Sequence, residues 1–463
     1  MNEATVKHAS IILTSWRLAA LIAAFYLILM TPLLGRKLGY TVDATPSFQL
    51  TRAIVSEGTL FPDVKVKQGW IYSIAYLPFY GLGTLLHATL FSAQPQDWVQ
   101  RKCMCWMNMA FAAMTLALIA RTLDRLGYSR RAQCGTALLY GFTTLAFSYA
   151  RYDYNKTLAG LMLIAAFYFF VRYWQTERKT RHFQTSALGC GFCFMALLLV
   201  RVEMAVLAPV FLIGMYRPQA SPNKQTPLAI FFAFVLMGFL FYAAYNRAYW
   251  SGGVSGGYEG SFVMDPSSAL LGFLGSPGKS LFLFNPIFLL LPLLVRHFVN
   301  RNKSIAAVWG GAVVLLFLLY SFWGNWWGGW GYGPRHLVPL LPLLALPIAE
   351  AIEMRSISTY AVLLTLGAAG LAVQILGALV DFNDVILFLA NQGITEQQII
   401  WQPLANPVYY HAQMAFAVGA SHWDIGWAWL WTQLSFPFFL LLFSIWTAGL
   451  SSLGILILRR TRK

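Results

Sequence analysis

Long apolar runs recur along this chain, and they are continuous rather than alternating with polar residues. A helix that crosses a bilayer needs about 20 apolar residues, whereas membrane β-strands alternate in polarity. The pattern therefore predicts an all-α polytopic membrane protein with about 12 transmembrane helices. The predicted spans are residues 15–34, 103–120, 132–149, 157–174, 184–200, 203–216, 228–247, 284–296, 305–323, 336–352, 358–379 and 429–456.

A further apolar run, residues 70–91, is long enough to cross, and the distribution of basic residues decides whether it does. If it does not cross, the predicted cytoplasmic segments hold 20 of the 33 Lys and Arg residues. If it crosses, every later loop changes side and only 10 of the 33 remain inside. Cytoplasmic loops carry the excess of Lys and Arg, so we predict a re-entrant or interfacial element at 70–91 and two cytoplasmic termini.

Composition agrees with a membrane protein. Of the 463 residues, 58% are hydrophobic and 11% are charged, and the mean hydropathy is +0.59. The net charge of +16 would suggest nucleic acid in a soluble chain, but here we interpret it as loop charge that sets orientation and meets anionic lipids. We expect membrane lipids and no nucleic acid as partners. The predicted location is the cytoplasmic (inner) membrane, or the endoplasmic reticulum membrane of a eukaryote, with the active site facing outside.

The chain has no separate soluble domain in its pattern. A Pro-rich cytoplasmic stretch at 217–227 divides it into two predicted transmembrane modules, residues 1–217 and 218–463. The first module contains the outer loop 35–102. The second contains the outer loops 248–283, 324–335 and 380–428.

Charged residues cluster in the first outer loop, although the chain as a whole is poor in charge. Asp43, Arg52 and Lys67 are the members that we single out. Thr45-Pro46 is typical of a helix start and Gly58 of a helix end, so we expect a short helix between them. Its apolar face would carry Phe48, Ile54 and Val55, as in a helix that lies on a membrane surface.

The outer loop 248–283 ends in Gly275-Ser-Pro-Gly-Lys279-Ser280. A nucleotide-binding P-loop is excluded because Phe273 stands where the first Gly of that motif is required. A Gly-rich turn with Lys279 suits a phosphate headgroup at the membrane surface. A helix start anchored by a snorkelling Lys is the alternative.

Aromatic residues and glycines alternate in residues 323–336, which include Trp327, Trp330, Tyr332, Arg335 and His336. Trp and Tyr at this depth often form only an interfacial belt. Glycine beside aromatic faces would also let a flat ligand approach backbone and ring together. We therefore interpret the stretch as a candidate site for a sugar, with Arg335 beside it for a phosphate.

Three further charges occur at the edges of predicted spans. Arg201 and Glu203 interrupt an apolar run, where charges are costly unless they line a cavity or pair with each other. Asp153 stands between Arg151 and Lys156, so a local ion pair is the simpler interpretation and a role with substrate the other. We retain Arg201 as a phosphate candidate and Asp153 and Glu203 as sugar or acceptor candidates.

Together these features resemble polyprenyl-phosphate-dependent glycosyltransferases of the GT-C superfamily, the protein O-mannosyltransferase and bacterial aminoarabinose transferase type. Asp43 matches the Asp that this family places after its first span, Arg52 follows at the family's spacing, and Lys67 matches the Lys of its Lys-Pro-Pro motif. Ala44 stands where the family has a Glu, so the loop gives no support for a divalent metal, and no cofactor is firmly implied. The resemblance implies the GT-C fold, with juxtamembrane helices in the first outer loop.

The resemblance also implies an activity for the cell envelope. The enzyme would move a hexosyl or pentosyl group, with inversion, from a polyprenyl-phosphate donor to a hydroxyl of a lipid, glycan or protein acceptor outside the membrane. Asp43 would be the catalytic base. The phosphate would be bound by Arg52, Lys67, Lys279, Arg335 and Arg201.

Two other functions fit a polytopic chain. A transporter or flippase for a lipid-linked sugar would favour charges near the bilayer midplane and a repeated half, whereas these charges lie at the outer rim and no repeat is visible. A non-catalytic envelope-assembly subunit would leave the charged cluster at 43–67 unexplained.

Overall fold

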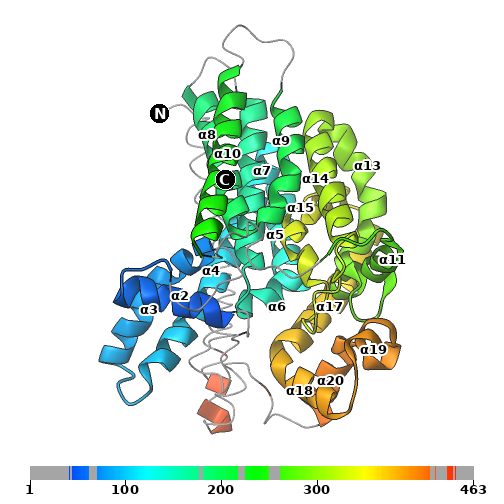
Figure 1. The fold of residues 1–463 in the computed structure, drawn as a ribbon. Helices are drawn as coiled ribbons and strands as arrows, with labels where there is room; N and C mark the ends of the chain where they lie inside the picture. The colour runs from blue at the N-terminus through cyan, green and yellow to red at the C-terminus, as the bar shows by residue number, and fades with distance from the viewer. Residues whose placement is uncertain are drawn as a thin grey trace.

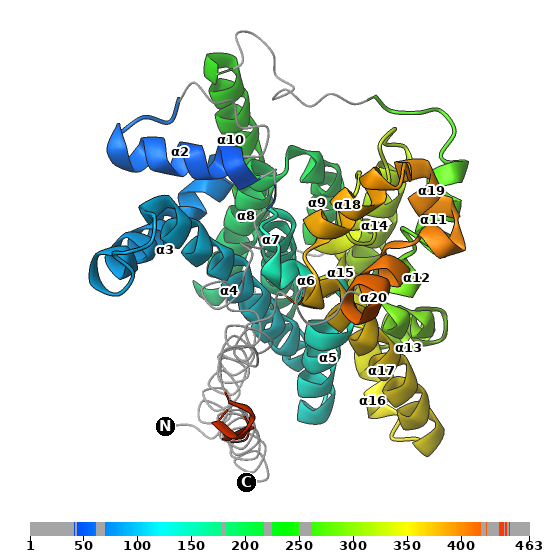
Figure 2. The ribbon, with the colours of Figure 1, turned by 90° about the horizontal axis from the view of Figure 1, so that it is seen from below.

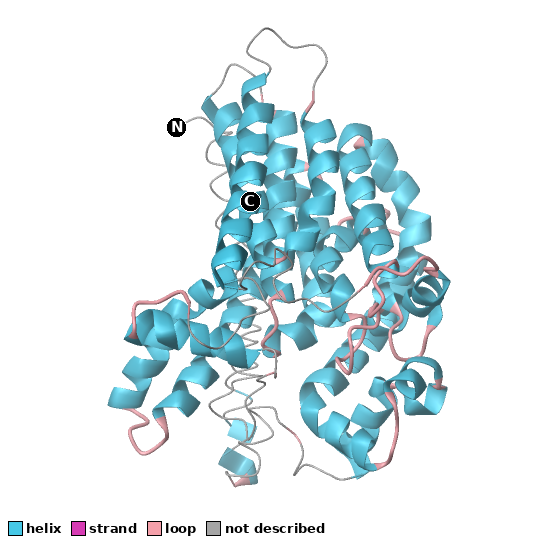
Figure 3. Ribbon diagram, viewed as in Figure 1, coloured by secondary structure: helices cyan, strands magenta, loops and turns pink. Residues whose placement is uncertain are grey.

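The computed structural model describes residues 41, 44–61, 70–176, 181–216, 225–249 and 261–417, and a few positions between 423 and 444. Within these residues the chain is helical, and its β contacts are two isolated bridges, Phe262 with Trp323 and Val380 with Trp423. Figure 3 shows the described helices joined by loops, without a strand. The all-α prediction is confirmed.

Most of the described residues lie in α-helices, with short 3-10 segments (η) between some of them (Figure 1). In chain order they are α2 (Ala44–Ser56), α3 (Trp70–Thr89), α4 (Gln96–Arg125), α5 (Arg130–Thr143), α6 (Leu145–Arg151), α7 (Lys156–Gln175), α8 (Arg181–Val200), η1 (Val202–Leu207), α9 (Ala208–Met215), α10 (Gln225–Tyr249), α11 (Ser267–Gly275), α12 (Leu281–Phe284), η3 (Pro286–Leu290), α13 (Leu291–Arg301), α14 (Lys303–Ser321), η4 (Arg335–Leu340), α15 (Leu341–Ala345), α16 (Ile348–Glu353), α17 (Ile357–Leu379), α18 (Phe382–Asn391), α19 (Glu396–Trp401), η5 (Pro403–Ala405) and α20 (Pro407–Ala417).

Seven helical stretches among the described residues are long and apolar enough to cross a membrane. The protein is therefore a multi-pass membrane protein. The seven are Gln96–Arg125, Lys156–Gln175, His182–Val200, Thr226–Tyr249, Lys303–Ser321, Arg335–Glu353 and Ile357–Leu379, and each coincides with a predicted span.

The remaining predicted spans divide into two groups. Segment 15–34 and nearly all of 429–456 lie outside the described residues. Segments 132–149 and 284–296 were predicted as single helices, and the structure interrupts both, the second at Asn285. Segment 203–216 is one short apolar helix, Val202–Met215, whose first half is the 3-10 segment η1. In 132–149 the break is at Thr144, which is extended and whose hydroxyl caps α6 by accepting from the Ala146 N–H at 3.3 Å. Hydrophobicity along the sequence does not reveal this break, because a single buried residue, Thr144, makes it and the apolar run continues on both sides.

Loops that were predicted to share the cytoplasmic side do contact one another. The Tyr128 hydroxyl donates to Glu350 at 2.5 Å, and the Arg301 guanidinium lies 4.3 Å from the centroid of the Tyr128 ring. The Gln175 side chain donates to the carbonyl of Arg125. The grouping of these loops at one end of the bundle agrees with the predicted topology; which end faces the cytoplasm stays a prediction.

Helix α3 occupies the segment predicted not to cross, and it is not among the span-forming helices. Residues on its two sides in sequence meet: Arg52 pairs with Asp97 at 3.2 Å, and the Arg101 guanidinium lies 4.3 Å from the Phe48 ring centroid. Figures 1 and 2 show α2 and α3 together beside α4, to one side of the main bundle. The contacts agree with a chain that enters and leaves this element on the same side of the membrane.

The predicted surface helix is α2, with two differences in detail. It begins at Ala44 rather than at Pro46, so Thr45 lies in its first turn instead of capping it. Its end agrees with the prediction: the helix stops before Gly58, whose φ of +67° is the left-handed conformation expected of a helix-ending glycine. Its buried face carries Phe48 but not Val55, which is 56% exposed, because α2 packs on α3 with Ser47 and Thr51 turned inward.

Candidate functional site

The connection between α6 and α7, residues 152–155, is buried and is fixed by a side chain from a third helix. Asn108 on α4 donates its amide to the carbonyls of Tyr152 and Tyr154, at 2.8 and 3.0 Å. These bonds satisfy carbonyls that the end of α6 and the loop leave without helical partners. The connection is therefore a rigid segment, and its successive side chains meet different parts of the fold.

Asp153 points toward α3. The Tyr72 hydroxyl donates to its Oδ1 at 2.7 Å and Tyr76 donates to the same atom, while Oδ2 has no hydrogen-bond partner among the described residues. Burial raises the pKa of Asp153 to about 6, although the two phenol bonds act in the opposite direction. The expected ion pair with Arg151 or Lys156 is not formed, because Arg151 donates to the carbonyl of Ala378 instead.

Thr41 connects the first outer loop to the backbone of Asp153. Its hydroxyl donates to the backbone carbonyl of Asp153 at 2.8 Å, and the Ala44 N–H donates to the Thr41 carbonyl at 3.0 Å. Thr41 and Ala44 flank residue 43 in the sequence. Asp43 and Lys67 themselves lie outside the described residues.

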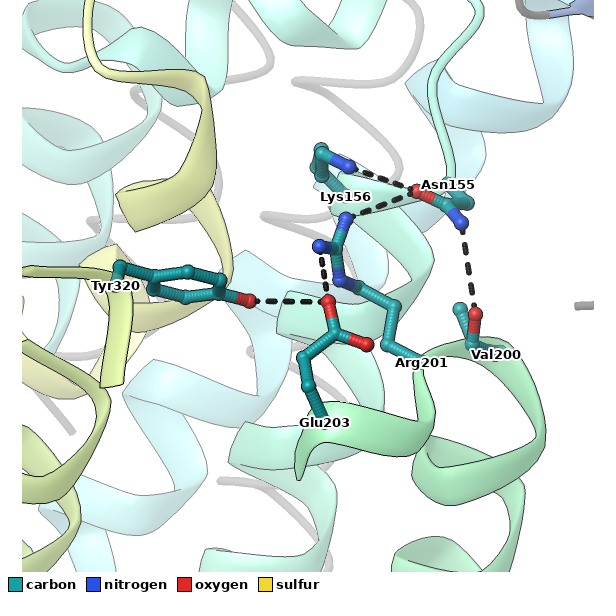
Figure 4. A network of polar contacts seen from close by, with 6 residues as sticks. All are labelled: Asn155, Lys156, Val200, Arg201, Glu203 and Tyr320. Carbon is teal, nitrogen blue, oxygen red and sulfur yellow. Dashed lines mark hydrogen bonds and ion pairs between the residues drawn. The ribbon is translucent and has the colours of Figure 1, made fainter. Parts of the chain in front are cut away.

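Asn155 meets the segment that follows α8 (Figure 4). Its Oδ1 accepts from Arg201 at 3.4 Å and from Lys156 at 3.4 Å. Arg201 is buried and forms an ion pair with Glu203, and the Tyr320 hydroxyl donates to Glu203 at 3.3 Å. The pair predicted between Arg201 and Glu203 is present, and it is built into a network that joins α7, η1 and α14.

Tyr154, between Asp153 and Asn155, contacts residues 323–336, which we call the aromatic loop. The Arg335 guanidinium lies 5.7 Å from the centroid of the Tyr154 ring. His336 stacks on Tyr320 with centroids 5.1 Å apart and an interplanar angle of 21°, and its Nδ1 has no hydrogen-bond partner among the described residues. The charges of Arg335, Arg201 and Lys279 all act on His336, so the three cations lie within electrostatic range of one imidazole.

Residues 327–333 form a loop of tight turns that packs around Arg335. Gly328 and Gly333 have φ of +70° and +68°. A Cβ on Gly328 would lie 2.7 Å from Arg335 Nε, so the arginine stem fits only against a glycine backbone. The sequence suggested that these glycines leave room for a ligand. In the structure, Gly328 leaves room for the side chain of Arg335.

The other candidates of this loop are positioned by neighbouring helices. Trp327 donates its indole N–H to Glu396 of α19 at 2.7 Å, and Trp330 packs against the small core of α17–α20. The Tyr332 ring is buried and its hydroxyl donates to the carbonyl of Val373 at 2.6 Å. In this arrangement Tyr332 belongs to the core.

The cations that were predicted to bind the phosphate fall into two groups in the structure. Arg201, Lys279 and Arg335 all lie within electrostatic range of His336, whereas Arg52 is exposed and paired with Asp97. Lys279 is fully buried, and its ammonium donates to the carbonyls of Gly329 and Gly331 at 2.7 Å and of Gly333 at 3.3 Å. The described residues contain no cluster of three or more His, Cys, Asp or Glu side chains that could hold a metal ion.

No family model and no curated protein matches the sequence. Among solved structures, the chain is similar to ArnT from Cupriavidus metallidurans, an aminoarabinose transferase and GT-C enzyme. The structure of its apo state has 13% sequence identity and a TM-score of 0.49, over 88% of this chain and 75% of that chain. The structure bound to undecaprenyl phosphate has 12% identity and a TM-score of 0.48, over 88% and 74%.

Sequence reasoning missed several members of the site. Tyr72 and Tyr76 hold Asp153, Asn108 fixes the connection, and Tyr320 joins Glu203 to His336. Tyr72 and Tyr76 are four residues apart in a segment already predicted to stay at the membrane surface, so they share a helix face toward the outer loops. That spacing was the available signal. Nothing in the sequence distinguished Tyr320 from an interfacial aromatic residue.

Proposed function

We propose that this protein is a membrane glycosyltransferase that moves a sugar from a polyprenyl-phosphate donor to an acceptor hydroxyl at the outer face of the membrane. One observation carries the proposal. The buried connection 153–155 carries a carboxylate with an unpartnered oxygen at Asp153, and the next two residues contact guanidinium groups, Tyr154 that of Arg335 and Asn155 that of Arg201. Cations and a carboxylate carried by or contacting one short segment suit a phosphate leaving group and an acceptor hydroxyl that react near each other.

The charge balance favours an anionic ligand. Arg201, Lys279 and Arg335 all act electrostatically on His336, while Glu203 is paired with Arg201, and Glu396 bonds Trp327 and acts on Lys279. An anion that binds near these cations would lower the electrostatic cost of burying Arg201 and Lys279. A lipid phosphate at the end of the bundle would supply the negative charge.

In the proposed reaction the acceptor oxygen attacks the anomeric carbon of the donor. The bond between that carbon and the phosphate oxygen breaks, and the polyprenyl phosphate leaves with the bonding electron pair. Arg335 and Arg201 stabilise the charge that grows on the phosphate. The proton of the acceptor hydroxyl passes to a carboxylate. A single displacement of this kind inverts the anomeric centre, and a hexosyl or pentosyl group would react alike.

We propose Asp43 as the base and Asp153 as the residue that holds a hydroxyl of the sugar or acceptor. The bond from Thr41 to the Asp153 carbonyl supports a shared site, because Thr41 is two residues from Asp43 and consecutive Cα atoms are about 3.8 Å apart. Lys67 and Arg52 remain proposed phosphate contacts of the first outer loop. Residues 1–217 and 218–463 would then be two modules of one enzyme, both of which contribute cations.

Donor binding gives the direct test. We would reconstitute the protein in nanodiscs and measure the affinity for undecaprenyl phosphate of the wild type, Arg335→Met and Arg301→Met. Arg301 is the matched control, because it contacts Tyr128 at the other end of the bundle. Loss of a charge-assisted contact should weaken binding about 10- to 100-fold in Arg335→Met and leave Arg301→Met unchanged.

Two results would reject the proposal. One is equal affinity in all three proteins. The other is sugar transfer from nucleotide sugars but not from polyprenyl-phosphate sugars. Movement of a lipid-linked sugar across vesicles without any transfer would instead identify a flippase.

A further inference from the structure

We propose that Lys279 is a positioning residue that fixes the aromatic loop, and through it Arg335, rather than a ligand of the phosphate. The inference rests on the proposed function for the role of Arg335. A lysine ammonium has three N–H donors, and Lys279 directs them to the carbonyls of Gly329, Gly331 and Gly333. None is left to bind a phosphate in this arrangement.

The turn that carries Lys279 is built to bring it into this position. The Gly278 N–H donates to the carbonyl of Ile400 at 3.2 Å, and a Cβ on Gly278 would lie 2.2 Å from the carbonyl oxygen of Ile399. The Lys279 N–H donates to the Ser276 hydroxyl at 2.9 Å. Only glycine lets the backbone at 278 pass this close to α19, so the Gly-Lys pair that resembled a phosphate-binding motif has a packing explanation.

The loop in turn depends on the ammonium. The left-handed turns at Gly329 and Gly333 direct alternate carbonyls to one side, where they converge on Lys279. The carbonyl of Tyr332 points elsewhere and accepts from the Tyr149 hydroxyl at 3.0 Å. Without the ammonium, the converging carbonyls would be buried with no donor, and the loop would rearrange to satisfy them.

A shared carbonyl links Arg335 to the clamp, that is, to the Lys279 ammonium and the three glycine carbonyls that it binds. The carbonyl of Gly333 accepts from Lys279 Nζ at 3.3 Å and from the backbone N–H of Arg335 at 3.0 Å. A change in the loop therefore displaces the backbone from which the Arg335 guanidinium reaches Tyr154. Burial and the nearby charge of Arg335 lower the pKa of Lys279 to about 7, and Glu396 acts in the opposite direction. The ammonium is thus held in place by geometry at an electrostatic cost.

A double-mutant cycle separates positioning from direct binding. We would measure undecaprenyl phosphate affinity in Lys279→Met, Arg335→Met and the double variant, with Lys303→Met as an exposed control at the other end of the bundle. Each single change should weaken binding about tenfold. If Lys279 acts through Arg335, the double variant should be no more than about twofold weaker than Arg335→Met. Independent losses that multiply would show a direct phosphate contact and overturn the inference.

Amide hydrogen exchange supplies a readout that does not depend on donor binding. Lys279→Met should speed exchange in the peptide that covers residues 326–336 and leave the peptide around Tyr128 unchanged. Unchanged exchange at 326–336 would reject the clamp, even if the wild type binds the donor. Failure of the wild type to bind undecaprenyl phosphate would reject the proposed function and leave the exchange test valid. If Lys279→Met does not fold, Lys279→Gln keeps two donors and should show the same non-additivity with a smaller loss.

Discussion

The carboxylate of Asp153 gives the most quantitative prediction. Its Oδ2 is buried and unpartnered among the described residues, while Oδ1 accepts from Tyr72 and Tyr76. We change Asp153 to Asn, which keeps the shape and keeps one oxygen for the phenols. It replaces the free oxygen by an N–H₂ group that cannot accept from a substrate hydroxyl.

The magnitude follows from the lost bond and from the pKa. A hydrogen bond to a charged group contributes about 1.5–3 kcal/mol, so Asp153→Asn should raise KM for the acceptor or donor about 10- to 150-fold. With a pKa of about 6, roughly nine-tenths of the wild-type carboxyls are ionised at pH 7 and roughly one-tenth at pH 5. The wild-type kcat/KM should therefore fall about tenfold between these pH values. The variant should lack that fall.

The free energy of unfolding of the wild type should fall as the pH rises, whereas its kcat/KM should increase. The folded-state pKa of about 6 lies above the ordinary 3.8, so the folded chain holds more protons between these values. Ionisation of Asp153 thus lowers the free energy of unfolding as the pH rises through this window. The melting temperature of Asp153→Asn, relative to the wild type, should be higher at pH 8 than at pH 4.

The assay is sugar transfer in nanodiscs at several pH values, with Asp43→Asn measured in parallel. Asp43→Asn should lower kcat about a hundredfold or more, as expected for a lost base, and keep donor affinity. Near-normal turnover in Asp43→Asn together with abolished turnover in Asp153→Asn would assign the base to Asp153. A flat wild-type profile between pH 5 and 8 would refute the reasoning about Asp153.

Two further predictions concern topology and packing. In a Cys-free background, an impermeant reagent added from outside should label Asp97→Cys and should not label Arg131→Cys. The reverse pattern would mean that residues 70–91 cross the membrane. Gly278→Ala should destabilise the fold by about 1–3 kcal/mol, because its Cβ meets Ile399, whereas Gly275→Ala, with nothing within 4 Å of its Cβ, should have little effect in a thermal melt.

The sequence predicted the membrane-spanning framework well, because span length and loop charge are set by the bilayer itself. Seven predicted spans are present, and the loops predicted to share a side do contact one another. The breaks inside segments such as 132–149 were not predictable from hydrophobicity. A single capping residue, Thr144, ends one helix and starts the next without any change in apolar character.

Scarcity of charge pointed to residues that the structure places near one another, whereas geometry decides which contacts they make. Arg201 and Arg335 were chosen because charge is scarce at the membrane edge, and both lie within electrostatic range of His336. Lys279 was chosen for the same reason, but its three donors go to backbone carbonyls, which no spacing rule reveals. Tyr332 looked like a ligand platform, yet its ring fills the core beside Phe284 and His411.

The short connection between α6 and α7 has a consequence for sequence variation. Its consecutive residues face three different neighbours: Asp153 faces α3, Tyr154 faces Arg335, and Asn155 faces Arg201. Inserting or deleting one residue between Arg151 and Lys156 would assign every side chain to the wrong neighbour, whereas a substitution would disturb only one. Relatives that keep the function should therefore vary in residue type here before they vary in length.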